Sequence, residues 1–251
     1  MSAPALEARG LTRRFGGLTA ADNVSFAVQP GARQALIGPN GAGKTTLINL
    51  LTGVIKPSEG AVLLQGEDVT ALSPSQRVRR GLARTFQINQ LFPGLSPAES
   101  LGLAISERNR WGADFWRVTG GKAAFVAEIE ELLTRFGLES VMDQPTRTLA
   151  YGKQRLLEIA LALACRPRVL LLDEPAAGVP EDERHDILAA LAALPADVAI
   201  LLIEHDMDLV FNFATRISVL VAGRLLCEGE PDAIAADERV RAVYLGEEAH
   251  G

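Results

Sequence analysis

Cysteine is scarce in this sequence: Cys165 and Cys227 lie far apart and lack the spacing of metal ligands. Such residues are usually small buried thiols in a reducing compartment. Long apolar runs are missing too, since none reaches the roughly 18 residues that a membrane-spanning helix needs. Residues Met1–Arg9 lack the basic start and the apolar stretch of a secretory signal. We therefore expect a folded, soluble protein of a reducing compartment.

An excess of positive charge is also absent. The 25 Lys and Arg residues are outnumbered by 31 Asp and Glu residues, for a net charge of −6. This balance argues against a nucleic-acid backbone as the main partner. With 251 residues, of which 48% are hydrophobic, the chain can bury a substantial core. That size suits one domain of mixed class, or one domain with an inserted subdomain.

The most informative motif is a glycine-rich loop between a short apolar strand, Gln34–Ile37, and a helix predicted over Thr46–Leu51. It fits the pattern G-x-x-x-x-G-K-[ST], in which backbone N–H groups cradle a polyphosphate and the helix N-terminus favours anions. In this pattern Lys44 reaches the β/γ oxygens and the Thr45 hydroxyl ligates Mg²⁺. The predicted nucleotide-binding residues of the loop are Gly38, Pro39, Asn40, Gly41, Ala42, Gly43, Lys44, Thr45 and Thr46.

Two further apolar runs, Val169–Leu172 and Ala199–Ile203, are typical of parallel strands buried on both faces. Ligands of parallel α/β sheets sit beyond the carboxyl ends of the strands, so we expect these ends to share a crevice with the glycine-rich loop. Asp173 suits Mg²⁺, directly or through water, and Glu174 is placed to orient or deprotonate an attacking water. His205 is expected to contact the γ-phosphate and stabilise charge during cleavage.

The remaining pattern fills out the architecture. Val24–Val28 and Ala61–Leu64 suggest an antiparallel patch beside the nucleotide strand. Between about residues 89 and 144 the texture changes to helices and loops, with one apolar helical face that ends near Gly137. Farther along the chain the pattern predicts a buried helix over Gln154–Ala164 and a helix with acidic residues in its first turn over Glu181–Leu194. It also predicts a terminal hairpin over Ile217–Cys227. Four arginines are expected to form a solvated basic face: Arg77, Arg79, Arg80 and Arg84.

Taken together and in this order, the motifs resemble those of the ATP-binding subunits of ABC transporters, over nearly the whole chain. Besides the glycine-rich loop, the resemblance rests on Arg84–Gln87, Leu149–Arg155, Leu170–Pro175 and Glu204–Asp206. It implies that Gln87 touches Mg²⁺ and the attacking water, and that Phe15 stacks on adenine. For Phe15 the alternative is a core aromatic on a strand.

The resemblance also assigns Leu149–Lys153 to the place of the family's Leu-Ser-Gly-Gly-Gln signature, which grips the ATP of a second subunit. It thus implies nucleotide contacts for Ala150, Tyr151 and Gly152. The sequence departs from the pattern, because Ala150 replaces the serine, Tyr151 a glycine and Lys153 the glutamine. Either the signature segment binds the ATP of the second subunit more weakly than usual, or Lys153 contributes positive charge to that binding. Pro180 stands where the family often has an aspartate, which puts communication between the two sites in question.

The resemblance implies an α/β P-loop NTPase with a mostly parallel core sheet, an N-terminal antiparallel β patch and an inserted α-helical subdomain. We expect one ABC ATPase domain over residues 1–251, with a nucleotide-binding core at 1–88 and 146–251 and the helical subdomain at 89–145. The implied cofactors are ATP and Mg²⁺. The implied partners are permease subunits, an identical or sister ATP-binding subunit and, indirectly, an extracytoplasmic solute-binding protein, with attachment to the cytoplasmic face of the cell membrane.

Four shorter sequence features resemble the branched-chain amino acid importer branch of the family. They are Gly16–Leu18, the Leu-Ala-Tyr-Gly signature, Glu174–Gly178 and the ending Tyr244–Glu247. Importers of urea and related amides, and the lipopolysaccharide-export ATPase, share parts of it. A soluble ABC ATPase of translation or DNA repair, or a P-loop kinase of a small molecule, are further alternatives. The segment Ile88–Leu95 is the expected permease contact, unless Leu91 and Phe92 pack within the helical subdomain.

Overall fold

The computed structural model describes residues 3–85, 91–111 and 122–248. These residues form two compact units. Unit 1 comprises the described residues of Met1–Arg84, Arg168–Glu174 and Ala196–Gly251, and unit 2 those of Thr85–Pro167 and Pro175–Pro195. The chain therefore passes from one unit to the other several times. The predicted boundary of a helical subdomain at 89–145 remains a prediction, and the two divisions differ at 85–88, 146–167 and 175–195.

The larger sheet of unit 1 has six strands in the order β10-β9-β3-β8-β7-β6. Every neighbouring pair is parallel except β9 with β10, which form the predicted terminal hairpin. Strands β7 and β8 are buried at every position, as their continuous apolar runs predict. The strands are β3 Arg33–Ile37, β6 Leu82–Arg84, β7 Val169–Asp173, β8 Ala199–Ile203, β9 Arg216–Val221 and β10 Arg224–Gly229.

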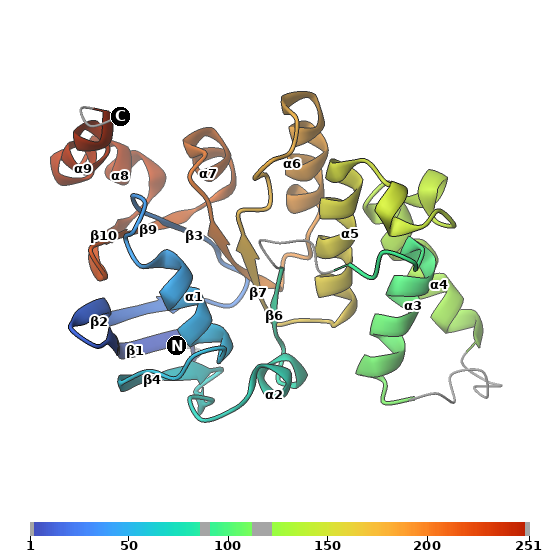
Figure 1. Ribbon diagram of the computed structural model, residues 1–251, viewed down its shortest axis with the longest axis horizontal. Helices are drawn as coiled ribbons and strands as arrows, with labels where there is room; N and C mark the ends of the chain where they lie inside the picture. The colour runs from blue at the N-terminus through green and yellow to red at the C-terminus, as the bar shows by residue number, and fades with distance from the viewer. Residues whose placement is uncertain (1–2, 86–90, 112–121, 249–251) are drawn as a thin grey trace. The chain divides into compact units, whose positions relative to one another are not determined.

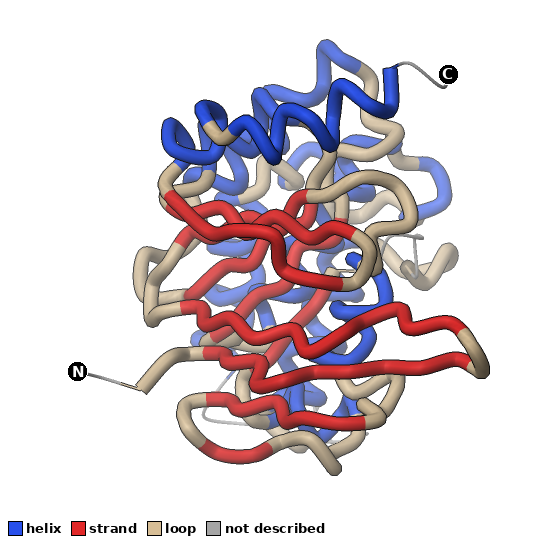
Figure 2. The backbone as a smooth tube through the Cα atoms, turned by 90° about the vertical axis from the view of Figure 1, so that its left-hand side faces the viewer, coloured by secondary structure: helices blue, strands red, loops and turns tan. Residues whose placement is uncertain are grey.

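A second sheet in unit 1 is antiparallel and has four strands in the order β2-β1-β4-β5. Figure 2 shows these strands in red, with the long β1–β2 hairpin facing the viewer. The sheet confirms the antiparallel patch predicted from the N-terminal third of the sequence. Its strands are β1 Leu6–Phe15, β2 Leu18–Val28, β4 Glu59–Leu64 and β5 Glu67–Asp68.

Of the helices of unit 1, α1, α7, α8 and α9 bury apolar residues in hydrophobic clusters with the sheets, whereas α2 buries Arg77; Figure 1 labels these helices. In α1 the residues Leu47, Ile48, Leu50 and Leu51 are buried in one hydrophobic cluster with side chains of both sheets. Burial of each such side chain stabilises the fold by about 1.5–3 kcal/mol. These helices are α1 Lys44–Thr52, α2 Pro74–Arg79, α7 Met207–Phe213, α8 Pro231–Ala236 and α9 Glu238–Glu248.

The predicted solvated basic face is wrong for Arg77, which is 1% exposed. Its guanidinium donates hydrogen bonds to the carbonyl oxygens of Leu50 at 2.8 Å, Leu51 at 2.5 Å and Thr70 at 2.9 Å. The last carbonyls of a helix lack partners within the helix, so a buried cation at the end of α1 satisfies them and suits the helix dipole. Burial lowers the pKa of Arg77, and the charge of Asp68 partly opposes that shift.

Unit 2 contains α3 Pro97–Arg108, α4 Lys122–Arg135, α5 Tyr151–Ala164 and α6 Arg184–Ala192. Helix α3 packs against both α4 and α5, and α5 also packs against α6. The predicted buried helix corresponds to α5, and Gly137 follows α4 with φ 59°, as its predicted role as a helix stop requires. The predicted helix over Glu181–Leu194 begins instead with a 3₁₀ turn, η4 Glu181–Glu183, before α6. The other 3₁₀ turns of this unit are η2 Glu139–Val141 and η3 Thr146–Thr148.

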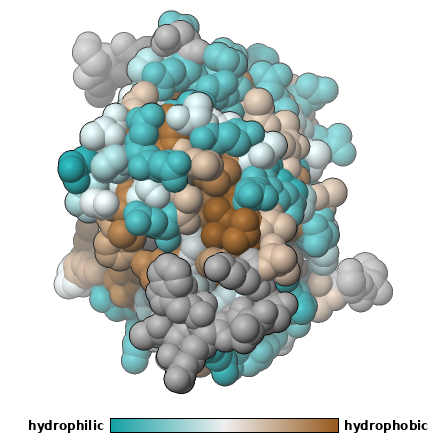
Figure 3. All heavy atoms as spheres, turned by 90° about the vertical axis from the view of Figure 1, so that its right-hand side faces the viewer, coloured by the Kyte–Doolittle hydropathy of each residue, from teal (hydrophilic) through white to brown (hydrophobic). Residues whose placement is uncertain are grey.

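Several large apolar side chains of unit 2 are exposed to solvent. Figure 3 shows apolar residues in brown among polar ones on one face of the protein. The exposed large apolar residues of unit 2 are Phe92, Leu103, Val126, Met142, Tyr151 and Leu188. In the part of the chain that the structure describes, no helix has the length and apolar character that crossing a bilayer requires.

Candidate nucleotide-binding site

The glycine-rich loop lies between β3 and a helix, as predicted, but the helix α1 begins at Lys44, two residues before the predicted start. Gly43 has φ 99°, in the left-handed region that favours glycine. A Cβ atom at Gly43 would lie 2.4 Å from the carbonyl oxygen of Ala20, and one at Gly38 would lie 2.1 Å from that of Leu220. Both positions therefore need glycine because the neighbouring backbone is too close for any side chain.

The start of α1 is suited to an anion. Its N-cap residue, Gly43, provides no side-chain hydrogen bond, so the amides of the first turn are not capped by a side chain. The Lys44 ammonium lies at the loop, where it donates to the carbonyl oxygen of Gly38 and to that of Pro39 at 3.0 Å. These amide donors beside a positive charge fit the phosphates of a nucleotide.

The three strands predicted to end at the site are neighbours in the order β3-β8-β7, and they run parallel. Ile203, the last residue of β8, pairs with Leu36 of β3 and with Asp173 of β7. Strands β3 and β7 are therefore two strand spacings apart, or about 10 Å. The prediction that the three strand ends meet at one edge of the sheet is confirmed, and all of them belong to unit 1.

Asp173 ends β7 and is 3% exposed. The Arg84 guanidinium donates to its Oδ2 at 2.7 Å and through a second nitrogen to Asn49 Oδ1 at 2.8 Å. The predicted solvated basic face is thus wrong for Arg84 as well, since its side chain is only 11% exposed. Sequence reasoning missed Arg84 and Asn49. No local signal marked them, because their partners lie far away in the sequence.

Glu174 has φ 47°, a left-handed conformation that is uncommon for residues other than glycine. Its N–H donates to the carbonyl oxygen of Ile203 at 2.9 Å, and its side chain is partly exposed. His205 Nδ1 lies 3.9 Å from Glu174 Oε1 and 3.7 Å from Oε2 of the buried Glu204. Next to it, Asp206 is the N-cap residue of α7, and its Oδ1 accepts a hydrogen bond from the Leu209 N–H at 3.1 Å.

Phe15 lies at the end of β1 with 45% of its surface exposed, so it is not a core aromatic. The Arg13 guanidinium lies over its ring, 4.6 Å from the centroid. Gln87, predicted to contact both nucleotide and Mg²⁺, lies outside the described residues, and its placement stays a prediction.

The signature segment begins α5 in unit 2, with Ala150 at the N-cap and no side-chain hydrogen bond from it. The N–H of Gly152 donates to Glu183 Oε2 at 3.0 Å. The exposed Tyr151 accepts a hydrogen bond on its hydroxyl from Arg155 at 2.6 Å. Lys153 donates from Nζ to the carbonyl oxygen of Gly137 at 3.1 Å. One amide of this helix start is therefore already paired with a carboxylate of the same unit.

The donors predicted for Mg²⁺ suit that ion. Thr45 offers a hydroxyl and Asp173 a carboxylate, both hard oxygen ligands at the edge of the sheet that carries the phosphate loop. Mg²⁺ usually takes one or two such protein ligands and completes its shell with phosphate oxygens and water. The two residues therefore fit a magnesium ion that arrives with a nucleotide.

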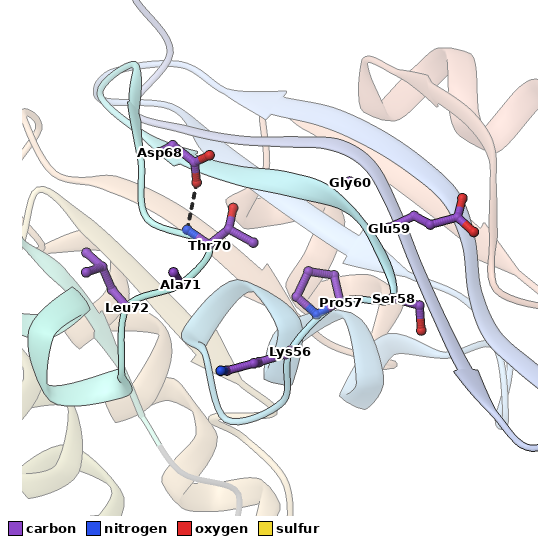
Figure 4. Close-up of a pocket in the computed structure, with 9 residues that line it drawn as sticks. All are labelled: Lys56, Pro57, Ser58, Glu59, Gly60, Asp68, Thr70, Ala71 and Leu72. Carbon is purple, nitrogen blue, oxygen red and sulfur yellow. Dashed lines mark hydrogen bonds between the residues drawn. The ribbon is translucent and has the colours of Figure 1, made fainter.

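A separate hollow of about 550 Å³ lies between the segment that leads into β4 and the segment that follows β5 (Figure 4). Within it the Thr70 N–H donates to Asp68 Oδ1 at 2.8 Å. None of the residues predicted for the nucleotide site lines it; its lining is Lys56, Pro57, Ser58, Glu59, Gly60, Asp68, Thr70, Ala71 and Leu72.

Comparison with known proteins agrees with this geometry. The family model described as "ABC transporter" matches residues 21–177, which include the phosphate loop, Asp173 and Glu174. The chain belongs to the ABC transporter family. The resemblance and the fold class expected from the sequence are thereby confirmed, and the small-molecule kinase is excluded. A second model, described as "Branched-chain amino acid ATP-binding cassette transporter", matches residues 224–250.

Relatives of this ABC protein match over its whole length. BraF of Pseudomonas aeruginosa, a high-affinity branched-chain amino acid transport ATP-binding protein, is 40% identical over 98% of this chain and 100% of its own. LivG of Escherichia coli, which carries the same description, is 39% identical over 98% and 100%. A nucleotide-free ATP-binding cassette from an ABC transporter superposes with a TM-score of 0.82, at 30% identity, over 96% and 98% of the two chains.

A further cassette, solved in its ADP conformation, has a TM-score of 0.81 at 29% identity and covers 98% of this chain and 100% of that chain. Cassettes of this fold therefore hold nucleotide. The chain is an ABC ATPase, homologous to ATP-binding subunits of branched-chain amino acid transport systems, and such subunits work with permease components.

Proposed function

We propose that this chain is the ATP-hydrolysing subunit of an importer for branched-chain or related amino acids. The observation that carries the catalytic part is that β3, β8 and β7 are neighbours in the sheet. The phosphate loop follows β3, His205 lies just after β8, and Asp173 and Glu174 lie at the end of β7. The cargo is supported by the two relatives named for branched-chain amino acid transport and by the C-terminal family match.

In this proposal the amides of the phosphate loop and the Lys44 ammonium bind the β- and γ-phosphates of ATP. Phe15 is the adenine-stacking residue, which its exposed position at the end of β1 permits. Glu174 accepts the proton of the attacking water or orients it, and its partly exposed carboxylate can reach solvent. His205 donates a hydrogen bond to the γ-phosphate as charge develops there.

Thr45, Asp173 and Gln87 are the proposed magnesium ligands, Gln87 by resemblance. Magnesium bound there would neutralise charge on the β- and γ-phosphates. The protein's own part is to hold the Asp173 carboxylate in place, which it does through the 2.7 Å contact with Arg84.

The proposed working unit is a dimer, formed with an identical or a sister subunit. Ala150, Tyr151 and Gly152 at the start of α5 then face the ATP of the other subunit. Binding of ATP favours the closed dimer, closure moves the permease, and hydrolysis reopens it. The subunit is thereby held at the cytoplasmic face of the membrane by its permease, and a solute-binding protein acts on it only through that permease.

The permease contact is proposed at Ile88–Leu95. Of the described part of this segment, Phe92 has 59% of its surface exposed and belongs to unit 2. An exposed aromatic of that size suits a protein interface. It also disfavours the alternative in which Phe92 packs inside the unit.

The proposal is tested by purifying the chain with its membrane partners and measuring ATP turnover as solute-binding proteins are added. Stimulation by a binding protein loaded with leucine, isoleucine or valine is expected. Stimulation only by a urea-loaded or amide-loaded binding protein would reassign the cargo and leave the ATPase assignment intact. A complex that hydrolyses no ATP with any of them would contradict the proposal as a whole.

A further inference from the structure

Arg84 is the last residue of β6. This strand is an edge strand of the six-stranded sheet, and its neighbour is β7. Its two terminal nitrogens make separate contacts. Nη2 lies 2.7 Å from Asp173 Oδ2, and Nη1 lies 2.8 Å from Asn49 Oδ1. The planar guanidinium therefore bridges a residue of helix α1 and the carboxylate that ends β7, and all three residues belong to unit 1.

Asn49 stands four residues after Thr45 in α1. Residues at that spacing lie one above the other on the same face of a helix. The contact with Arg84 thus fixes the face of α1 that carries the hydroxyl proposed for Mg²⁺. Its other contact fixes the proposed carboxylate ligand, so one side chain sets the separation of the two.

Burial makes this arrangement energetically important. The side chains of Arg84 and Asp173 are 11% and 4% exposed, and a buried carboxylate is costly unless a cation or hydrogen-bond donors face it. A lysine could supply the charge, but its single ammonium lacks the fork that reaches two fixed acceptors. Positive charge beside a cation site repels the cation, so any benefit of Arg84 to metal binding comes from position.

We propose that Arg84 is a positioning residue for magnesium: it acts through Asp173 and Asn49 and sets how much Mg²⁺ strengthens nucleotide binding. This rests on the proposed function, which makes Thr45 and Asp173 the metal ligands. Partners that hold metal-ligating carboxylates commonly contribute about 10- to 100-fold to metal affinity.

The test measures binding of a fluorescent ATP analogue to the full chain, once in EDTA and once in saturating Mg²⁺. The ratio of the two dissociation constants is the gain from magnesium. Replacing the guanidinium (Arg84→Met) is expected to lower this gain about tenfold and to change the affinity in EDTA by less than about twofold. Arg84→Lys is expected to lose nearly as much, because charge without the fork cannot bridge both acceptors.

Asn49→Ala keeps the buried ion pair and removes only the link to α1, so it remains informative if Arg84→Met folds poorly. A loss of about threefold in the same gain is expected, since a single hydrogen bond of the guanidinium is removed. Arg80→Met is the matched control: Arg80 comes from the same predicted basic face, and its exposed side chain pairs with Glu67 at 3.1 Å. Its gain should equal that of the wild type.

Wild-type gain in Arg84→Lys would show that charge alone suffices, and it would overturn the proposal. A larger gain in Arg84→Met would overturn it too, because repulsion of Mg²⁺ would then dominate. An unchanged gain in Asn49→Ala would show that the contact with α1 does not affect magnesium binding, and it would overturn the proposal as well. If the wild type itself shows no gain from Mg²⁺, the proposed function fails together with this inference, whereas the other outcomes leave the proposed function standing.

Discussion

Helices α1 of unit 1 and α5 of unit 2 share a role in the proposed mechanism, because each presents its N-terminus to phosphate, yet they begin differently. Both start without a side-chain cap on the N-cap residue. In α1 the preceding loop is built from glycines, and Lys44 supplies the positive charge. In α5 the Gly152 amide already bonds a carboxylate, that of Glu183. The start of α1 is therefore suited to bind phosphate directly, whereas at the start of α5 a phosphate has to displace the Glu183 carboxylate from the Gly152 amide.

The two units also differ in where their buried charged side chains lie. In unit 1 the buried carboxylates Asp173 and Glu204 lie at the strand ends that form the candidate site. In unit 2 the buried pair Arg155–Glu158 lies within α5 itself, with a contact of 2.8 Å. The buried carboxylates of unit 1 therefore lie beside the proposed catalytic residues, whereas the buried ion pair of unit 2 lies within a single helix.

Glu174→Gln gives the largest effect expected, and it probes the chemical role of unit 1. An amide cannot accept the proton of the attacking water, so ATP turnover should fall by about 10²- to 10⁴-fold while ATP binding is retained. Steady-state phosphate release and equilibrium binding measure the two quantities. Lys44→Ala serves as the contrasting variant, in which ATP affinity itself should fall. Turnover at the wild-type rate in Glu174→Gln would mean that the assigned base is wrong.

Arg77→Met probes what holds α1, and therefore the phosphate loop, in unit 1. The apolar side chain removes the guanidinium donor from the carbonyl oxygens of Leu51 and Thr70, while that of Leu50 keeps the Gly53 N–H at 3.2 Å. The free energy of unfolding should fall by about 3 kcal/mol, as measured by urea denaturation. Arg79→Met, which changes an exposed arginine of the same helix, is the control and should lie within about 0.5 kcal/mol of the wild type. A loss no greater than that of the control would contradict the structural role of Arg77.

Glu183→Ala probes the exchange of anions at α5. If the Gly152 amide receives phosphate from a second subunit, removing its present acceptor removes a competitor. In a Glu174→Gln background, which prevents hydrolysis, the ATP concentration at half-maximal dimerisation should fall about three- to tenfold, which is the size of the net contribution of one ordinary hydrogen bond. Light scattering over an ATP titration measures it. Glu181→Ala, from the same 3₁₀ turn, is the control; weaker dimerisation of Glu183→Ala would show that Glu183 supports the helix start instead.

Glu128 offers the smallest effect, a pH dependence confined to unit 2. Hydrogen bonds from Arg108, at 2.6 and 2.9 Å, hold the pKa of Glu128 below its ordinary value of 4.5. A lowered folded-state pKa contributes stability that is present above pH 4.5 and is lost as the pH falls through the folded-state pKa. Glu128→Gln should therefore be about 1–2 kcal/mol less stable at pH 7, with the difference shrinking in acid. Denaturation of both proteins across this range measures it, with Glu131→Gln as the exposed control; a difference that stays constant with pH would refute it.

Much of unit 1 could be predicted because its signals are local. The runs Val169–Leu172 and Ala199–Ile203 are apolar at every position, and the residues after them carry the chemistry. The burial of Arg77 and Arg84 could not be predicted, because nothing in a basic segment shows that its partners lie elsewhere in the chain. Asp173 is 89 residues from Arg84, and Leu50 is 27 residues from Arg77. Likewise, no local pattern separates the 3₁₀ turn η4 from the helix α6 that follows it.

The left-handed backbone at Glu174 has a consequence for how this protein can change. Only glycine takes a φ of 47° without steric cost, and an acid held there carries a strain on the order of 1 kcal/mol. Given the proposed role of Glu174 as the catalytic base, a glycine in its place would make folding easier and end catalysis, so selection for robustness and selection for turnover act in opposite directions on this single codon. Attempts to raise thermal tolerance by replacing non-glycine residues of positive φ would therefore include the residue on which the proposed turnover depends.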